Sequence, residues 1–307
     1  MYKKLTADFH EMTNLQKELR EKLIATAYIS AFNSPVISRD SGSETVKFLF
    51  TLEDGKRVET VLIVHDGRKT VCISTQVGCP VACLFCATGK MKECRNLTVS
   101  EIINQFIYIK KHFAPDLTNI VFMGMGEPFL NYENVIHAAN LLNDQRGLRI
   151  GARRITISTA GIIRSLERYI QEEHGFKLAI SLTGRNNELR NKLIPINQKY
   201  PLEDLLKVAK KFSATRKNKI TFEWVLIHGL TDTDEDIAFL VKLHCQMSCK
   251  INLIPLNPVD NELARTPEKR IHEFFSALKQ AGCQITIRNS PGDDIQAACG
   301  QLNAEIP

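Results

Sequence analysis

A regular alternation of short apolar strands with longer helices, beginning near Thr70, is the feature that most restricts the fold of this chain. Alternation of this kind predicts parallel strands joined by right-handed helical crossovers. The expected strands are 70–74, 119–124, 154–158, 177–182, 220–227, 250–255 and 284–288, and the expected helices are 98–112, 132–143, 161–173, 201–213, 233–245 and 267–281. About six repeats predict an α/β fold with a partial (βα)6 barrel rather than the closed eight-fold barrel.

The first 66 residues do not follow this rhythm. Residues 15–26 carry apolar side chains three and four apart, which predicts a helix. Residues 46–52 and 57–64 alternate like strands, and Glu53-Asp54-Gly55 between them predicts a hairpin turn. We therefore expect a small N-terminal helix and β-hairpin in residues 1–66 and the barrel core in residues 67–307.

Composition limits the class of protein. Hydrophobic residues make up 44% and charged residues 24% of the chain, which is enough apolar matter for a globular core. The net charge of +6 permits nucleic-acid binding without demanding it. The start of the chain has no apolar signal segment and no apolar run is long enough to span a membrane, so we expect a cytoplasmic protein with no membrane contact. Nine cysteines there indicate buried thiols, metal binding or redox catalysis rather than a disulfide framework.

Chemically reactive residues follow the expected strands. Active sites of barrel folds lie at the carboxyl ends of the strands, so these residues are candidates for one site. They are Cys79, Cys83 and Cys86 after the first strand, 124–128 after the second, Ser158 at the end of the third, Ser181 at the end of the fourth, and Asn257 after the sixth.

The first of these groups is the strongest motif. Cys79, Cys83 and Cys86 have C-x3-C-x2-C spacing, so three thiolates within eight residues could surround one metal centre. Structural zinc sites take four ligands, commonly from two C-x2-C pairs, and no second pair lies nearby. Four cysteines hold the [4Fe–4S] cluster of ferredoxins, so three would leave one iron open. Core thiols or a zinc site remain the alternatives, and Cys94 is a candidate fourth ligand.

Several separated stretches together resemble one family, the radical S-adenosylmethionine (SAM) enzymes. More closely, the chain is similar to the RNA methyltransferases that modify adenine C2 in 23S rRNA and tRNA, and to their C8-methylating relatives. The stretches that carry the resemblance are 57–60, 72–79, 123–128, 155–161, 193–197, 251–258 and 292–302. The resemblance implies a [4Fe–4S] cluster on Cys79, Cys83 and Cys86, and SAM used twice per turnover.

The resemblance also implies a cofactor pocket. Gly126 and Glu127 match the pair that binds the amino group of SAM, and a carboxylate suits an ammonium group. The matches for the remaining cofactor contacts are Ser158, Ser181, Leu182, Thr183 and Asn257. Thr183 departs from the pattern, because a histidine is usual there. Taken alone, a Ser or Asn at a strand end more often caps a helix.

Three further residues match catalytic positions. Cys299 matches the cysteine that accepts a methyl group from one SAM molecule, before a second SAM yields the 5′-deoxyadenosyl radical that activates this methyl. Cys72 matches the cysteine that then attacks the sulfur, forms a disulfide and releases the methylated base. Glu59 matches the proton acceptor. Without the resemblance, both cysteines would be interpreted as buried core thiols and Glu59 as a solvated strand residue.

The expected partners follow from the same resemblance. They are RNA, in the form of 23S rRNA and tRNA, and an electron donor such as flavodoxin or ferredoxin; we expect a monomer. Relatives carry a longer N-terminal helical domain, so 1–66 is interpreted as its remnant. Basic clusters that could meet phosphates are 90–95, 146–154 and 185–192, whereas we interpret the basic run 207–219, mostly a helix and its exit loop, as a solvated face. The alternatives are a C8-methylating resistance enzyme, an iron–sulfur or zinc protein without methyl transfer, and an inactive RNA-binding paralogue.

Overall fold

The computed structural model describes residues 5, 8–27, 32, 34–215, 219–260, 262–288, 292 and 294–304. Parts of the expected N-terminal appendage (1–4, 6–7, 28–31 and 33), Asp293 of the C-terminal motif, and 216–218 of the 207–219 basic run lie outside this description. No helix within these ranges is both long and apolar enough to cross a membrane.

A ten-stranded sheet forms the centre of the molecule. Its strands stand in the order β1 (Val36–Arg39), β2 (Val46–Thr51), β3 (Arg57–His65), β4 (Arg68–Cys72), β7 (Asn119–Phe122), β8 (Ile155–Thr159), β9 (Lys177–Ser181), β10 (Ile220–Leu226), β11 (Cys249–Pro255) and β12 (Ile285–Ile287). The first four strands pair antiparallel, and every pairing from β4 to β12 is parallel. The sheet runs from β1 to β12 without closing on itself in the described residues, which confirms the partial barrel.

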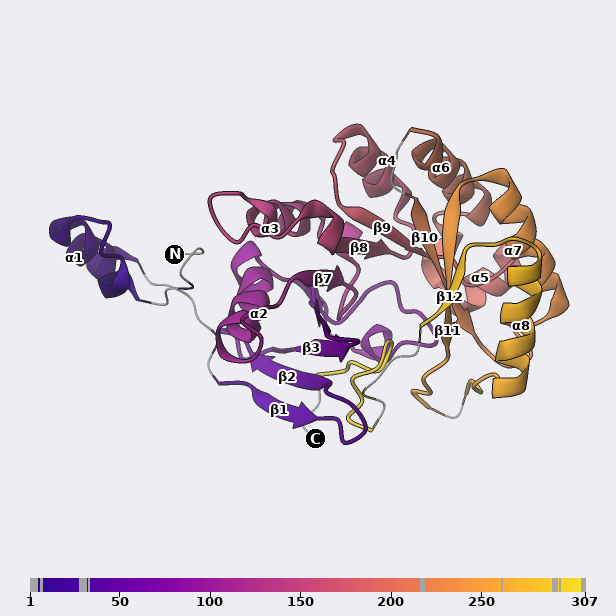
Figure 1. The fold of residues 1–307 in the computed structure, drawn as a ribbon, viewed down its shortest axis with the longest axis horizontal. Helices are drawn as coiled ribbons and strands as arrows, with labels where there is room; N and C mark the ends of the chain where they lie inside the picture. Colours follow the sequence, from indigo (N-terminus) through magenta and orange to yellow (C-terminus); the bar gives the residue numbers. More distant parts are fainter. Residues whose placement is uncertain are drawn as a thin grey trace.

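Helices cover the outer face of this sheet, as Figure 1 shows. They are α2 (Val99–His112), α3 (Tyr132–Asn143), α4 (Ile163–Gln171), α5 (Asn187–Leu193), α6 (Leu202–Thr215), α7 (Asp234–Gln246) and α8 (Glu268–Gln280). Capping boxes fix where two of them begin: Thr98 with Glu101 starts α2, and Thr233 with Asp236 starts α7. In a capping box each side chain bonds the other residue's backbone N–H, which satisfies donors the helix itself leaves free.

The core lies between the helices and the sheet. Phe222 and Trp224 of β10 are fully buried, and the Trp224 ring packs against Phe239 of α7 with centroids 5.9 Å apart. Side chains alternate between the two faces of a strand. Glu223, which stands between these two aromatic residues, therefore points to the opposite, concave face.

The N-terminal hairpin is confirmed and continues into the barrel sheet. Gly55 adopts a φ of 78° in the turn between β2 and β3, a conformation that favours glycine. A second turn at Asp66 and Gly67 joins β3 to β4, so the appended strands and the parallel strands share one sheet. In Figure 1 helix α1 (Lys17–Thr26) stands apart from this body.

Sequence patterns missed several short elements. These are β1, the two-residue ribbon of β5 (Gln76–Val77) with β6 (Arg95–Asn96), helix α5, and the 3-10 turns η1 (Phe9–Glu11), η2 (Ala87–Lys90), η3 (Pro128–Leu130), η4 (Ala152–Arg154) and η5 (Pro195–Gln198). These elements are too short to show a periodic sequence pattern. They form because neighbouring segments hydrogen-bond to them.

Candidate active site

The cysteine loop lies at the carboxyl end of β4. Burial is the main cause that raises the pKa of the Cys79 and Cys83 thiols, and the neighbouring cysteines of the motif raise it further. Cys79 and Cys83 therefore share one weakly solvated environment, with Cys86 close to both. Val81 of the loop packs with Leu193, Ile194 and other apolar side chains, and Cys79 and Cys83 pack against the same cluster.

Arg190 places a buried positive charge beside this loop. Its guanidinium donates to the carbonyls of Leu182 (2.6 Å), Ala160 (2.7 Å), Ser181 (3.0 Å) and Thr183 (3.3 Å), so it ties the ends of β8 and β9 together. Burial lowers its pKa to about 10, opposed by the charge of the Cys83 thiolate. A cation here favours thiolates, the form in which cysteine binds metal. Arg190, expected in a surface basic cluster, is instead a structural residue of the site.

The loop after β7 packs closely on the segment after β4. A Cβ on Gly126, whose φ is 101°, would lie 2.6 Å from the Gln76 side chain, so only glycine fits there. Glu127 is buried, and its carboxylate accepts from the backbone N–H groups of Ala160 (2.7 Å) and Phe129 (2.9 Å). Burial nevertheless raises its pKa to about 7.

The remaining expected cofactor contacts lie where β8, β9 and β11 end. Ser158 and Ser181 are half-buried strand-end residues, and Leu182 is buried beside them. The Thr183 hydroxyl accepts from the Val225 N–H (2.9 Å), so the sheet already uses its acceptor. The Asn257 amide donates to the Cys299 carbonyl (3.0 Å), so Asn257 holds the C-terminal segment in place.

That C-terminal segment lies directly against the cysteine loop. Ala87 donates its N–H to the Gly300 carbonyl (2.7 Å), and the Thr88 hydroxyl donates to the Leu302 carbonyl (2.5 Å). A Cβ on Gly300 would lie 3.0 Å from the Phe85 carbonyl oxygen. In Figure 1 this yellow segment runs back from β12 toward β2 and β3.

The fold brings Cys72 and Cys299 into one electrostatic environment. Burial raises the pKa of Cys72 to about 12; Arg288 lowers it and Cys299 raises it. Burial also raises the pKa of Cys299, with Arg288 again opposing, and Cys86 of the loop is among its charged neighbours. Cys299 as a residue is exposed, although protein atoms surround its thiol. All nine cysteines are free thiols in the structure.

Arg288 and Glu223 complete this group, and sequence patterns did not single them out. Arg288 directly follows β12 and donates to the Met123 sulfur (3.1 Å). Glu223 is buried on β10, accepts from the Asn252 amide (3.0 Å), and has a raised pKa because of burial. Its other carboxylate oxygen, Oε2, has no hydrogen-bond partner in the described residues and is an acceptor available to a ligand. The strand-end rule applied to Arg288 would have found it.

Glu59 lies in a different setting from the expected solvated strand. It is fully buried, forms an ion pair with Lys47 (2.9 Å between Oε1 and Nζ), and accepts with Oε2 from the N–H groups of Asn303 (2.8 Å) and Ala304 (3.1 Å). Glu59 therefore anchors the end of the segment that carries Cys299.

The thiols fit an iron–sulfur cluster better than a single ion. Within the described ranges, no three Cys, His, Asp or Glu side chains are grouped so that they could hold one metal ion. A [4Fe–4S] cluster binds each thiolate to a different iron, so its cysteines stand around a cube rather than meeting at one point. Three soft donors, an apolar surround and a nearby buried cation suit that cluster. Cys94 is exposed.

Comparisons with known proteins identify the family of this chain. The Radical SAM superfamily model matches residues 73–241, and the model of the ribosomal RNA large subunit methyltransferase N-terminal domain matches residues 1–29. A dual-specificity RNA methyltransferase RlmN of Pelobacter propionicus is 42% identical, covering 100% of this chain and 88% of its own. A probable RlmN of Dictyoglomus turgidum is 44% identical, covering 99% and 88%.

Solved structures indicate the same family. The crystal structure of a radical SAM methyltransferase from Sphaerobacter thermophilus has a TM-score of 0.93 and 40% identity, covering 99% of this chain and 90% of that one. The hydrogenase maturase HydG shares the fold alone, at a TM-score of 0.53 and 10% identity over 75% of this chain and 54% of that one. The chain belongs to the radical SAM superfamily and, within it, to the family of dual-specificity RNA methyltransferases RlmN.

Proposed function

We propose that this protein methylates C2 of adenine in 23S rRNA, at the peptidyl-transferase centre, and in tRNA. The observation that carries the proposal is the meeting of Cys72 and Cys299 beside Arg288, with Cys86 of the cysteine loop among the charged neighbours of Cys299. An iron–sulfur protein without methyl transfer would need neither of these two thiols. The similar proteins are named as dual-specificity RNA methyltransferases, which supports RNA methylation and does not favour an antibiotic-resistance role.

Cys79, Cys83 and Cys86 would hold a [4Fe–4S] cluster, and SAM would bind at its open iron. When bound, the cluster supplies an electron that splits SAM and yields a 5′-deoxyadenosyl radical. Gly126 lets the backbone approach the cofactor closely, and the Glu127 carboxylate would bind its ammonium group. Ser158, Ser181, Leu182, Thr183 and Asn257 are proposed as the wall of the same pocket.

Cys299 is the proposed methyl acceptor. Its thiol must lose a proton before it can displace a methyl group from a sulfonium, and Arg288 favours that loss because it stabilises the thiolate. Exposure of Cys299 would then let the methyl group meet a target adenine. Cys72 would attack the same sulfur to release the product, which leaves a Cys72–Cys299 disulfide for an external thiol to reduce.

Glu59 is the proposed proton acceptor, and its setting adds a condition. Its two carboxylate oxygens are occupied by Lys47 and by the N–H groups of residues 303 and 304. Proton transfer to Glu59 therefore requires residues 303–304 to move away. Their displacement would free one oxygen while Lys47 keeps the other charged.

The finer assignments complete the proposal. We infer two SAM molecules per turnover, because one methylates Cys299 and another supplies the radical. A flavodoxin or ferredoxin would reduce the cluster, and the protein would act as a cytoplasmic monomer. Residues 1–66 would assist RNA binding, and residues 67–307 would carry the chemistry.

Mass spectrometry gives the direct test. Protein reconstituted with iron and sulfide should hold about four irons per chain. After incubation with methyl-labelled SAM, the label should appear on Cys299 and, once RNA is added, on adenine C2. Replacement of Cys299 by Ser should abolish both labels while iron content stays unchanged. A label on adenine that persists in C299S would refute the proposal.

A further inference from the structure

Five cations of the basic clusters 90–95, 146–154 and 185–192 are neutralised by acidic neighbours. The pairs are Lys90 with Asp260, Arg95 with Asp54 and Glu101, Arg146 with Asp144, Arg185 with Asp236, and Lys192 with Glu188. A phosphate that approached such a pair would have to compete with a carboxylate. Cations without an acidic partner are better candidates for anion binding.

Four such cations gather at the opposite end of the barrel from the cysteine loop. Arg68 begins β4, Arg153 lies just before β8, Lys177 begins β9, and Lys250 is the second residue of β11. All four side chains are exposed, and no ion pair joins any of them to an acidic group in the described part of the chain. We call these four residues the amino-end cluster.

Strand register places three of them on the concave face of the sheet. Arg68 and Cys72 are four residues apart on β4, and Lys177 and Ser181 are four apart on β9, so each pair shares a face. Thr221 pairs with both Ala179 and Lys250, which places Lys250 on the face that carries Glu223. The cluster thus lies on the same face as the site thiols, one strand length away.

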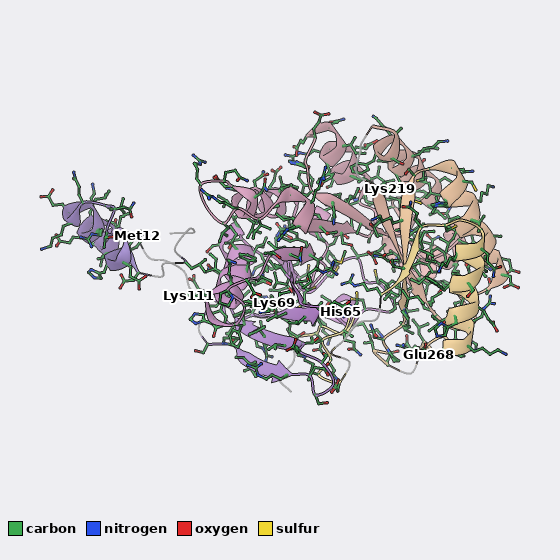
Figure 2. All side chains as sticks on the ribbon, in the orientation of Figure 1. Met12, His65, Lys69, Lys111, Lys219 and Glu268 are labelled. Carbon is green, nitrogen blue, oxygen red and sulfur yellow. The ribbon has the colours of Figure 1, made fainter. Side chains whose placement is uncertain are left out.

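The charges of the cluster act on one another. Burial lowers the pKa of Lys177, and Lys250, Arg68 and Arg153 each lower it further. Lys219 directly precedes β10 and is labelled in Figure 2. It donates to the neutral Gln284 side chain (2.9 Å), so the positive charge of Lys219 adds to that of the amino-end cluster. Repulsion among these cations is unrelieved within the described residues and would be relieved by a bound polyanion.

We propose that the amino-end cluster binds backbone phosphates of the substrate RNA, several nucleotides away from the target adenine. The proposal rests on the proposed function. A five-residue strand spans about 17 Å, a distance that an RNA chain readily covers. Phosphate contacts of this kind position a nucleic acid without reading its sequence.

The surroundings favour RNA over an acidic protein. Protein interfaces usually have an apolar core inside a polar rim. The large apolar side chains that are exposed in the described residues are Leu19, Ile24, Val36, Ile37, Leu130 and Leu230. None of them begins a strand of the parallel set, so the amino-end cluster has no apolar centre for a protein partner.

Salt-dependent RNA binding tests the proposal. The variant K177Q/K250Q would be compared with wild type and with K242Q/K269Q, in which two exposed lysines of the outer helices α7 and α8 change. The probes are an unmodified tRNA transcript and a 23S rRNA fragment, titrated between 50 and 200 mM salt. Loss of two phosphate contacts should lower the slope of log Kd against log salt by about 1.4 to 1.8 and weaken binding about tenfold near 150 mM.

The outcomes separate this proposal from the proposed function. K242Q/K269Q should match wild type, and R68Q/R153Q should repeat the effect of K177Q/K250Q. If wild type binds RNA and K177Q/K250Q binds it with the same slope, the amino-end cluster is not an RNA site and the methyltransferase assignment stands. If K177Q/K250Q binds RNA normally and only slows reduction of the iron–sulfur cluster by flavodoxin, the amino-end cluster docks an electron donor. The RNA proposal is then wrong. If wild type neither binds nor methylates RNA, both proposals fail.

Discussion

Lys47 and Glu59 form an ion pair of 2.9 Å in the interior of the appended sheet, where both side chains are buried. The pair lies across two adjacent antiparallel strands, β2 and β3. Glu59 also bonds the N–H groups of residues 303 and 304, and Lys47 approaches the Gln296 carbonyl (3.5 Å). One buried pair therefore links the N-terminal hairpin to the segment that carries Cys299.

Removing one partner of this pair should destabilise the protein. Lys47→Met leaves the Glu59 carboxylate buried without its counter-charge, which costs about 3 kcal/mol or more. The double variant Lys47→Met with Glu59→Gln should recover much of that loss, because no uncompensated charge remains. Urea unfolding of both variants measures the difference. If the free energy of unfolding of Lys47→Met lay within about 0.5 kcal/mol of the wild-type value, the ion pair would not stabilise the fold.

Arg288 should control the reactivity of Cys299. Arg288 lowers the pKa of that thiol, so Arg288→Gln raises the pKa and reduces the thiolate fraction at pH 8. Each unit of rise should slow alkylation of Cys299 by iodoacetamide about tenfold. Peptide mass spectrometry follows the rate, with the exposed Cys94 as internal reference. Arg288→Lys should restore the rate in part, since it keeps the charge; equal rates in all three proteins would exclude this role for Arg288.

Binding of SAM should weaken below neutral pH. Burial raises the pKa of Glu127 from 4.5 to about 7, so the carboxylate that would hold the ammonium group is about one-tenth ionised at pH 6 and nine-tenths at pH 8. The apparent affinity scales with that fraction, so the Kd for SAM should be about tenfold higher at pH 6 than at pH 8. Equilibrium dialysis of reconstituted protein measures this Kd, and Glu127→Gln should remove its dependence on pH.

The same pKa shift sets the sign of a stability effect. A carboxyl group with a raised folded-state pKa binds its proton more tightly in the folded state than in the unfolded state. The contribution of Glu127 to the stability of the SAM-free protein is therefore greatest below pH 4.5 and declines as the pH rises toward 7. Urea unfolding of wild type and E127Q at several pH values measures this contribution. If wild type instead gained stability relative to E127Q as the pH rose from 4.5 to 7, the assigned pKa shift would be wrong.

Cys72→Ala should trap RNA on the protein. Without Cys72, nothing attacks the Cys299 sulfur, so the base stays bonded through the methyl carbon. A denaturing gel should show an RNA–protein crosslink with this variant, and Cys72→Ala with Cys299→Ser should show none. Cys283→Ala, at a buried thiol in the loop between α8 and β12, serves as the matched control and should turn over normally.

Local patterns predicted much of this molecule. The C-x3-C-x2-C spacing and the strand-end rule located Cys79, Cys83, Cys86 and the loop with Glu127, because neighbours along the chain set their chemistry. The parallel strands were predictable because each is a short apolar run followed by a helix. Element ends shifted by a few residues, as with the helix expected at 161–173 and found at Ile163–Gln171.

What the sequence did not reveal depends on long-range contacts. Arg288 is one arginine after a three-residue strand, and only folding brings it to Cys72, more than two hundred positions earlier. The burial of Glu59 could not be predicted, because its partners come from β2 and from the far end of the chain. Arg190 looked like a surface cation because its carbonyl partners lie at the ends of two strands, β8 and β9, that only the sheet brings together.

The anchoring of residues 299–304 has a consequence for protein synthesis. The ribosome makes residues 79–86 early, and the proposed methyl acceptor Cys299 emerges more than two hundred residues later. Under the proposed function, methylation of Cys299 therefore has to wait until residues 299–304 have been synthesised and have settled against Glu59 and Thr88.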